Sequence, residues 1–117
     1  MSKCLDPFNE ENYDLAVFSA FRLVEETVRT KAGLDEEDFG VNLMSKAFNP
    51  STGKLSIPTL ELPAEQEGIH SLFRGAIAVF KNPSSHRTVS YESRFSVLQT
   101  IVAAELLLNI VSTAQLK

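Results

Sequence analysis

The segment Pro63 to Arg87, PAEQEGIHSLFRGAIAVFKNPSSHR, decides the fold because it contains a long amphipathic pattern followed by a sharp stop. Proline and glutamate at Pro63 and Glu65 suit the first turn of a helix. The pair Asn82-Pro83 ends that helix, because proline disfavours helical angles in the residue before it. In between, apolar residues recur at spacings of three and four and predict a broad buried face, formed by Ile69, Leu72, Phe73, Ala76, Ile77 and Phe80.

Two further helices are predicted before this segment. The first runs from about Glu11 to Lys31, with Gly33 as its C-terminal cap, and buries a face with helical spacing: Tyr13, Val17, Ala20, Val24 and Val28. The run Asp35 to Asp38 supplies acidic groups suited to the N-terminus of a short second helix, which passes through Leu43, Met44, Ala47 and Phe48. Residues 54–62 contain Pro58 and alternate loosely, so we expect an extended crossing or one weak hairpin strand there.

A fourth helix, from about Ser90 to Ala114, carries two apolar stripes. One stripe holds Val97, Ile101, Ala104, Leu108 and Val111, and the neighbouring one holds Leu98, Val102, Leu106 and Ile110. A face this wide needs either a central position in the bundle or a second subunit that covers it. The sequence leaves both alternatives open.

The length predicts a single domain over residues 1–117, which could be the C-terminal domain of a longer protein, and the helical patterns predict an all-α fold of four to five helices. The hydrophobic share of 44% can close one core without disulfides. Cys4 is the only cysteine, which fits a reducing, cytoplasmic setting. Because Glu105 and Asn109 interrupt the most apolar stretch, we interpret it as a core helix and expect no membrane span.

The net charge of −4 argues against a surface that binds nucleic acid all over, but the charges are unevenly distributed. Residues 1–69 hold 6 basic and 13 acidic side chains, whereas residues 70–117 hold 5 basic and 2 acidic ones. Only the second half could therefore attract an anion.

The loop Lys81-Asn82-Pro83-Ser84-Ser85-His86 is the candidate site. The turn at Asn82-Pro83 could bring the Lys81 ammonium close to the His86 imidazole, and the next helix N-terminus would offer free N–H groups to a phosphate. Further donors nearby in sequence are Ser84, Ser85, Arg87, Arg74 and Arg94. The plain alternative is a solvated or structural histidine beside a helix stop, with basic residues in their usual place near a helix end.

The block Glu67-Gly68 to Gly75-Ala76, continued by Phe80 to Arg87, resembles the signature of a widespread prokaryotic family known as Ymh-like, roughly E-G-x-x-x-L-F-x-G-A followed by R-N-P-x-A-H-R. Matching residues also occur in the first two predicted helices, so the resemblance covers most of the chain. By extension, the domain is similar to the HEPN superfamily, helical bundles that include metal-independent ribonucleases of toxin, antiviral and CRISPR-associated systems.

The resemblance implies roles for three residues. Lys81 stands where the catalytic HEPN motif has arginine, Asn82 is the polar residue, and His86 is the histidine. His86 would act as general acid or base in 2′-hydroxyl attack on the RNA phosphodiester, with Lys81 stabilising charge on the phosphate oxygens. Lysine lacks the bidentate guanidinium fork, so the exchange for arginine is not conservative. The resemblance also implies a two-fold dimer, with no metal or cofactor.

Three functions remain open from the sequence. The first is a domain that binds RNA or nucleotide through the loop as a homodimer, and the second is a metal-independent endoribonuclease of the toxin or phage-defence type that uses His86 and Lys81. The third is a structural or protein-interaction bundle without chemistry. The Lys81 exchange and the acidic first half favour the non-catalytic readings slightly.

Overall fold

The computed structural model of the chain describes residues 10–81 and 94–117. The described elements are α1 (Glu10–Ala32), α2 (Gly40–Phe48), β1 (Leu55–Ser56), α3 (Pro63–Ala76), the π-helical segment η2 (Ile77–Lys81), α5 (Arg94–Thr113) and β2 (Gln115–Leu116). The described residues form an all-α bundle, as the sequence predicts, together with one small two-stranded sheet. The predicted helix starting near Ser90 is described from Arg94 onward.

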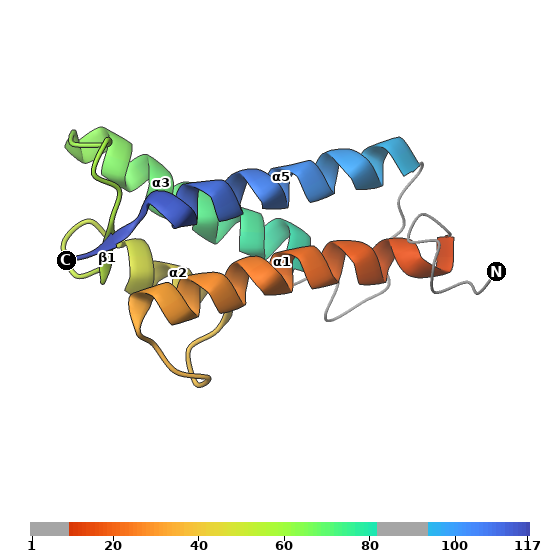
Figure 1. Ribbon diagram of the computed structural model, residues 1–117, viewed down its shortest axis with the longest axis horizontal. Coiled ribbons are helices and arrows are strands. Elements are labelled where there is room, and N and C mark those ends of the chain that lie inside the picture. Colours follow the sequence, from red (N-terminus) through yellow and green to blue (C-terminus); the bar gives the residue numbers. More distant parts are fainter. Residues whose placement is uncertain (1–9, 82–93) are drawn as a thin grey trace.

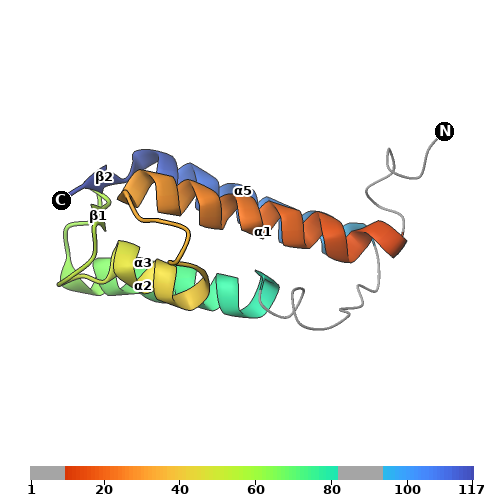
Figure 2. The ribbon, with the colours of Figure 1, turned by 90° about the horizontal axis from the view of Figure 1, so that it is seen from below.

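The helices form two layers. Figures 1 and 2 show α1 and α5 side by side in one layer, running in the same direction, and α2 and α3 in the other layer. Helix α3 runs back against the direction of α1. Near the C-terminal ends of α1 and α5, Lys31 Nζ donates a hydrogen bond to the backbone oxygen of Ser112 at 3.4 Å.

The core lies between the layers and joins residues from every helix. Phe21 on α1, Phe73 on α3 and Val97 on α5 are completely buried. The Phe73 ring lies 4.3 Å from that of Phe48 on α2, and the Phe21 ring stacks on that of Phe80 at 5.1 Å. These aromatic pairs fasten the middle and the C-terminal end of the α3–η2 helix to its neighbours.

The predicted apolar face of the first helix is confirmed, since Val17, Val24 and Val28 are completely buried. Gly33 is confirmed as the cap, because its φ of 68° lies in the left-handed region that glycine adopts without strain. The role predicted for the acidic run 35–38 is wrong. Helix α2 begins at Gly40, after an uncapped Phe39, and has no acidic residue in its first turn.

The extended segment between α2 and α3 pairs with a distant partner. Strand β1 forms an antiparallel pair with β2, with Leu55 opposite Leu116 and Ser56 opposite Gln115. The extended crossing is therefore confirmed, whereas the hairpin alternative is wrong, because the partner follows α5 in the chain. This pairing fastens the C-terminal end of α5 to the α2–α3 connection.

The third predicted helix changes from α-helical to π-helical winding near its C-terminal end. Phe73 and Ile77 are buried as expected, but Leu72 is 43% exposed, so its assignment to the buried face is wrong. The last described turn, Ile77–Lys81, is π-helical, and its wider winding changes the direction of the side chains that follow. The predicted stop at Asn82-Pro83 lies outside the described residues.

Helix α5 buries one apolar stripe and exposes the other. Val97, Ala104 and Val111 are at most 1% exposed, whereas Leu98, Val102 and Leu106 are 40%, 59% and 55% exposed. A single chain therefore does not use α5 as a central helix. Within the described residues, Ser96–Thr113 is also long and apolar enough to cross a membrane by length and composition, with a mean hydropathy of 1.5.

Candidate functional site

The structure describes the predicted loop site only at its two borders, residues 81 and 94. Lys81 ends η2, and Arg94 begins α5. The remaining loop residues of the prediction lie within 82–93, outside the described residues: Asn82, Ser84, Ser85, His86 and Arg87. The structure therefore gives the surroundings of Lys81 and leaves its distance to His86 as a prediction.

Lys81 turns toward α1. Its Nζ atom lies 3.6 Å from Oε2 of Glu25 and 5.7 Å from the centre of the Phe18 ring. The Lys81 side chain is only 15% exposed. The π-helical turn accounts for this direction, because it places Phe80 against Phe21 and Lys81 beside Glu25 on the same flank of α1.

Glu25 is the centre of a polar cluster in the middle of the bundle. It is 5% exposed, and its Oε1 accepts a hydrogen bond from Nη2 of Arg29 at 3.3 Å. Its Oε2 accepts the backbone N–H of Gly40 at 2.8 Å. Glu25, and not the acidic run 35–38, therefore supplies the negative group at the N-terminus of α2. The Nε atom of Arg29 donates to the backbone oxygen of Asp38 at 3.0 Å.

One carboxylate in this cluster faces two cations. A buried charge is tolerated when it is paired and hydrogen-bonded, and Glu25 meets both conditions. The Arg29 and Lys81 side chains are 16% and 15% exposed, so this ion-paired cluster is largely shielded from water.

The structure separates Arg74 from Lys81. Arg74 is exposed on α3, seven residues before Lys81, which corresponds to about 10 Å along a helix. Its exposure contrasts with the inward direction of Lys81, so the described residues do not bring the two into one cluster. Arg94 is placed at the first turn of α5 by its backbone.

Sequence reasoning missed Glu25, and the signal that could have found it is its spacing. Glu25 follows the buried Phe21 by four residues and sits between Val24 and Val28, so the helical period places it on the buried side of α1. A carboxylate at a buried position requires a cationic or N–H partner. The adjacent Glu26 is half exposed and pairs with Arg22 on the outside.

A second missed cluster ties α2 to α3. His70 is 7% exposed, its Nδ1 lies 3.3 Å from Oε1 of Glu67, and its Nε2 lies 3.3 Å from Oγ of Ser45. Since a carboxylate only accepts, Nδ1 donates to Glu67 and Nε2 accepts from the Ser45 hydroxyl. The order serine, histidine, carboxylate matches that of a nucleophilic triad.

Triad chemistry also needs donors aimed at an oxyanion. Ser45 lies inside α2, where its own N–H belongs to the helical ladder, and this sets it apart from a nucleophile on an open turn. We therefore interpret the chain from Ser45 to Glu67 as a polar link between two helices. In residues 10–81 and 94–117, no group of three His, Cys, Asp or Glu side chains could hold a metal ion.

Comparison with known proteins gives one match. A family model described as "Protein of unknown function (Hypoth_ymh)" matches residues 1–111. No curated protein and no solved structure shows a significant match. The match covers nearly the whole chain, including the block from Glu67 to Arg87.

Proposed function

The chain belongs to the Hypoth_Ymh family, and we propose that it acts as a homodimeric, HEPN-like domain that binds the phosphate of RNA or a nucleotide. The two copies meet through the exposed side of α5. The ligand binds at the loop that connects η2 to α5. The dimer is the part of the proposal that the geometry supports best.

The proposal of a dimer rests on one observation, the exposed apolar stripe of α5, which consists of Leu98, Val102 and Leu106. These side chains follow one another at intervals of four residues, so they form a continuous line along one side of the helix. Each is at least 40% exposed in the single chain. Contiguous apolar surface of this kind marks an interaction site, because burying it removes apolar area from water.

The size of the surrounding surface suits a dimer. Helices α2 and α3 lie on one side of the layer formed by α1 and α5, so the opposite side of that layer is an outer face (Figure 2). A helix of 20 residues is about 30 Å long, and two helices side by side are about 20 Å wide. This face measures on the order of 600 Å², close to the roughly 800 Å² that each partner contributes to a standard interface.

A second copy fits the exposed side of α5 better than lipid does. Gln99, Glu105 and Asn109 are exposed along the same helix as the apolar stripe. Placing a charged carboxylate in hydrocarbon costs on the order of 3 kcal/mol. At a protein interface such groups form hydrogen bonds or remain at the hydrated rim.

The phosphate site rests on charge and on the loop sequence. The half of the chain from residue 70 onward is the basic one, and Arg74 offers an exposed guanidinium. In the proposal, His86, Asn82 and Arg87 contact the ligand directly, with Ser84, Ser85 and Arg94 as further donors. Lys81, held by Glu25, contributes its charge from the edge of the site.

The experiment for the dimer compares two substitutions of equal exposure on opposite layers. Val102→Glu changes the α5 stripe, and Val79→Glu changes a residue of η2 that is 60% exposed, against 59% for Val102. We expect sedimentation equilibrium to give a dimer for the wild type and Val79→Glu, and a monomer for Val102→Glu. A monomeric wild type at high protein concentration contradicts the dimer. Co-sedimentation of wild type with lipid vesicles, lost in Val102→Glu, would assign the stripe to a membrane instead.

The experiment for the ligand compares wild type with His86→Ala. We expect the variant to bind a short single-stranded RNA at least tenfold more weakly, with the RNA intact in both samples. RNA cleavage by wild type that is lost in His86→Ala, without added metal, would establish the endoribonuclease alternative. Equal RNA and nucleotide binding by both proteins, or none by either, removes the loop as a site.

A further inference from the structure

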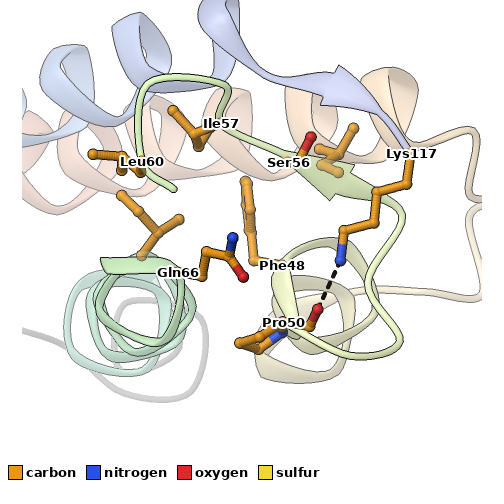
Figure 3. Close-up of a pocket in the computed structure, with 9 residues that line it drawn as sticks. Phe48, Pro50, Ser56, Ile57, Leu60, Gln66 and Lys117 are labelled. Atoms are coloured by element: carbon orange, nitrogen blue, oxygen red, sulfur yellow. Dashed lines mark hydrogen bonds between the residues drawn. The ribbon is translucent and has the colours of Figure 1, made fainter. Parts of the chain in front are cut away.

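A pocket lies at the end of the bundle far from Lys81, between strand β1 and the ends of α2 and α3 (Figures 1 and 3). Its volume is about 290 Å³, including the part that is open to solvent. All residues that line it belong to the described part of the chain. Neither the loop site nor the α5 stripe contributes to it, so any ligand here is independent of the proposed function.

The inner wall of the pocket is apolar. Phe48, Leu55 and Ile57 line it and are 4%, 2% and 8% exposed. Leu60 and Ile69 form the sides and are partly buried. An inner wall of this kind favours the alkyl or aromatic part of a ligand, because it forms few hydrogen bonds with water.

This wall is held in place by the fold. The Phe48 ring packs against Phe73 at 4.3 Å, and the pairing of Leu55 with Leu116 fixes the strand beside it. Pockets that bind small molecules are usually formed before the ligand arrives, which limits the entropy lost on binding. The apolar wall is therefore in place before a ligand arrives.

The mouth of the pocket carries two groups that donate hydrogen bonds. Lys117 Nζ donates to the backbone oxygen of Pro50 at 2.9 Å and lies 3.5 Å from that of Asn49. An ammonium has three N–H donors, so one remains for a ligand. Figure 3 shows the side chains of Lys117 and Gln66 on either side of Phe48, with the Lys117–Pro50 bond dashed.

Gln66 is the second donor. Its Nε2 atom donates to the backbone oxygen of Glu61 at 3.4 Å, and an amide nitrogen has two N–H groups. The nearby Glu65 carboxylate is occupied, because its Oε1 accepts the backbone N–H of Leu62 at 3.2 Å. A cation and an amide donor above an apolar wall are complementary to a negatively charged acceptor on an apolar body.

We infer that this pocket binds a small apolar carboxylate, such as a short fatty acid or an aromatic acid. The apolar part contacts Phe48, Ile57 and Ile69, and the carboxylate accepts from Lys117 and Gln66. The 290 Å³ is an upper limit because it includes open solvent, so only a small ligand fits and part of it stays in contact with water.

The test uses the 117-residue protein, labelled with ¹⁵N, and three probes of equal chain length: hexanoate, hexan-1-ol and hexylamine. Titrations followed by two-dimensional NMR give the affinity of each probe and the residues it perturbs. We expect hexanoate to bind most tightly and to shift the amide signals of residues 55–60 and 66–69. Equal affinity for hexan-1-ol, or shifts confined to other parts of the chain, overturns the inference.

Two variants separate the role of the cation from that of the apolar wall. Lys117→Met should weaken hexanoate about fivefold and leave hexan-1-ol unchanged, as expected for one exposed charge-assisted bond. Lys54→Met is the matched control, because Lys54 is an exposed lysine beside β1 that does not line the pocket. Leu60→Trp should abolish hexanoate binding by filling the space, with folding checked by circular dichroism. Unchanged hexanoate affinity in Lys117→Met refutes the carboxylate site.

Discussion

Removing the charge of Glu25 should destabilise the protein far more than removing that of its neighbour Glu26. Glu25→Gln keeps the side-chain volume and an oxygen for the Gly40 N–H, but it leaves Arg29 and Lys81 without their carboxylate. Breaking a buried ion pair costs about 3–5 kcal/mol. Because Arg29 and Lys81 are 16% and 15% exposed and can partly rehydrate, we expect about 2–3 kcal/mol for Glu25→Gln.

The measurement is urea unfolding followed by circular dichroism, with thermal unfolding as a second readout. A loss of this size lowers Tm by about 10 °C in a domain of this length. Glu26→Gln is the control, since the Arg22–Glu26 pair is 62% and 50% exposed and should contribute less than about 0.5 kcal/mol. Adding Lys81→Met to Glu25→Gln should restore about 1 kcal/mol, because it removes a cation that has lost the Glu25 carboxylate. If Glu25→Gln and Glu26→Gln cost the same within error, the cluster does not stabilise the fold.

Four further substitutions test other parts of the structure. Gly53→Ala should lower the free energy of unfolding by at least about 2 kcal/mol, because its Cβ would lie 2.5 Å from the Asn49 backbone oxygen. Gly75→Ala should raise it by about 0.5–1 kcal/mol, because Gly75 lies in a helix and its Cβ would meet nothing within 4 Å. Urea unfolding measures both changes. His70→Ala should cost about 2–3 kcal/mol in the same assay, because it opens a cavity and leaves Ser45 without its acceptor. The hydrogen bond from Lys46 to Asp38 raises the pKa of Lys46 above its ordinary value of 10.5. Its stabilisation is present below pH 10.5 and is lost as the pH rises through the higher folded value, so the Tm difference between wild type and Lys46→Met should vanish in strongly alkaline buffer.

Helical periodicity predicted the elements of this fold well where one face of a helix is buried. The boundaries of α1 differ from the prediction by one residue at each end, and Val17, Val24 and Val28 are buried as expected. The same periodicity separated the two stripes of α5, although it could not decide which one faces solvent. That choice depends on the position of α5 relative to α1 and the α2–α3 layer, which no local pattern contains.

The parts that escaped prediction are long-range or depend on backbone winding. The strand that pairs with β1 follows α5 in the chain. Strands of two residues are too short for their composition to indicate which segments pair. The π-helical turn at Ile77–Lys81 gives no periodic signal of its own, yet it turns Lys81 toward Glu25. Of the candidate site, the sequence identified Lys81 as a residue at a helix end but not the carboxylate on α1 that holds it.

The direction of α5 along the outer face limits how the two copies of the proposed dimer can share a ligand. If the two-fold axis of the dimer crosses the outer face at right angles to the helices, the two α5 helices run antiparallel and their Arg94 ends lie at opposite ends of a pair about 30 Å long. If the axis runs along the helices, both Arg94 ends lie at the same end, and the two connecting loops can face one substrate. A spin-label distance between the two copies of position 94 therefore tells whether the dimer has two separate binding sites or a single composite one.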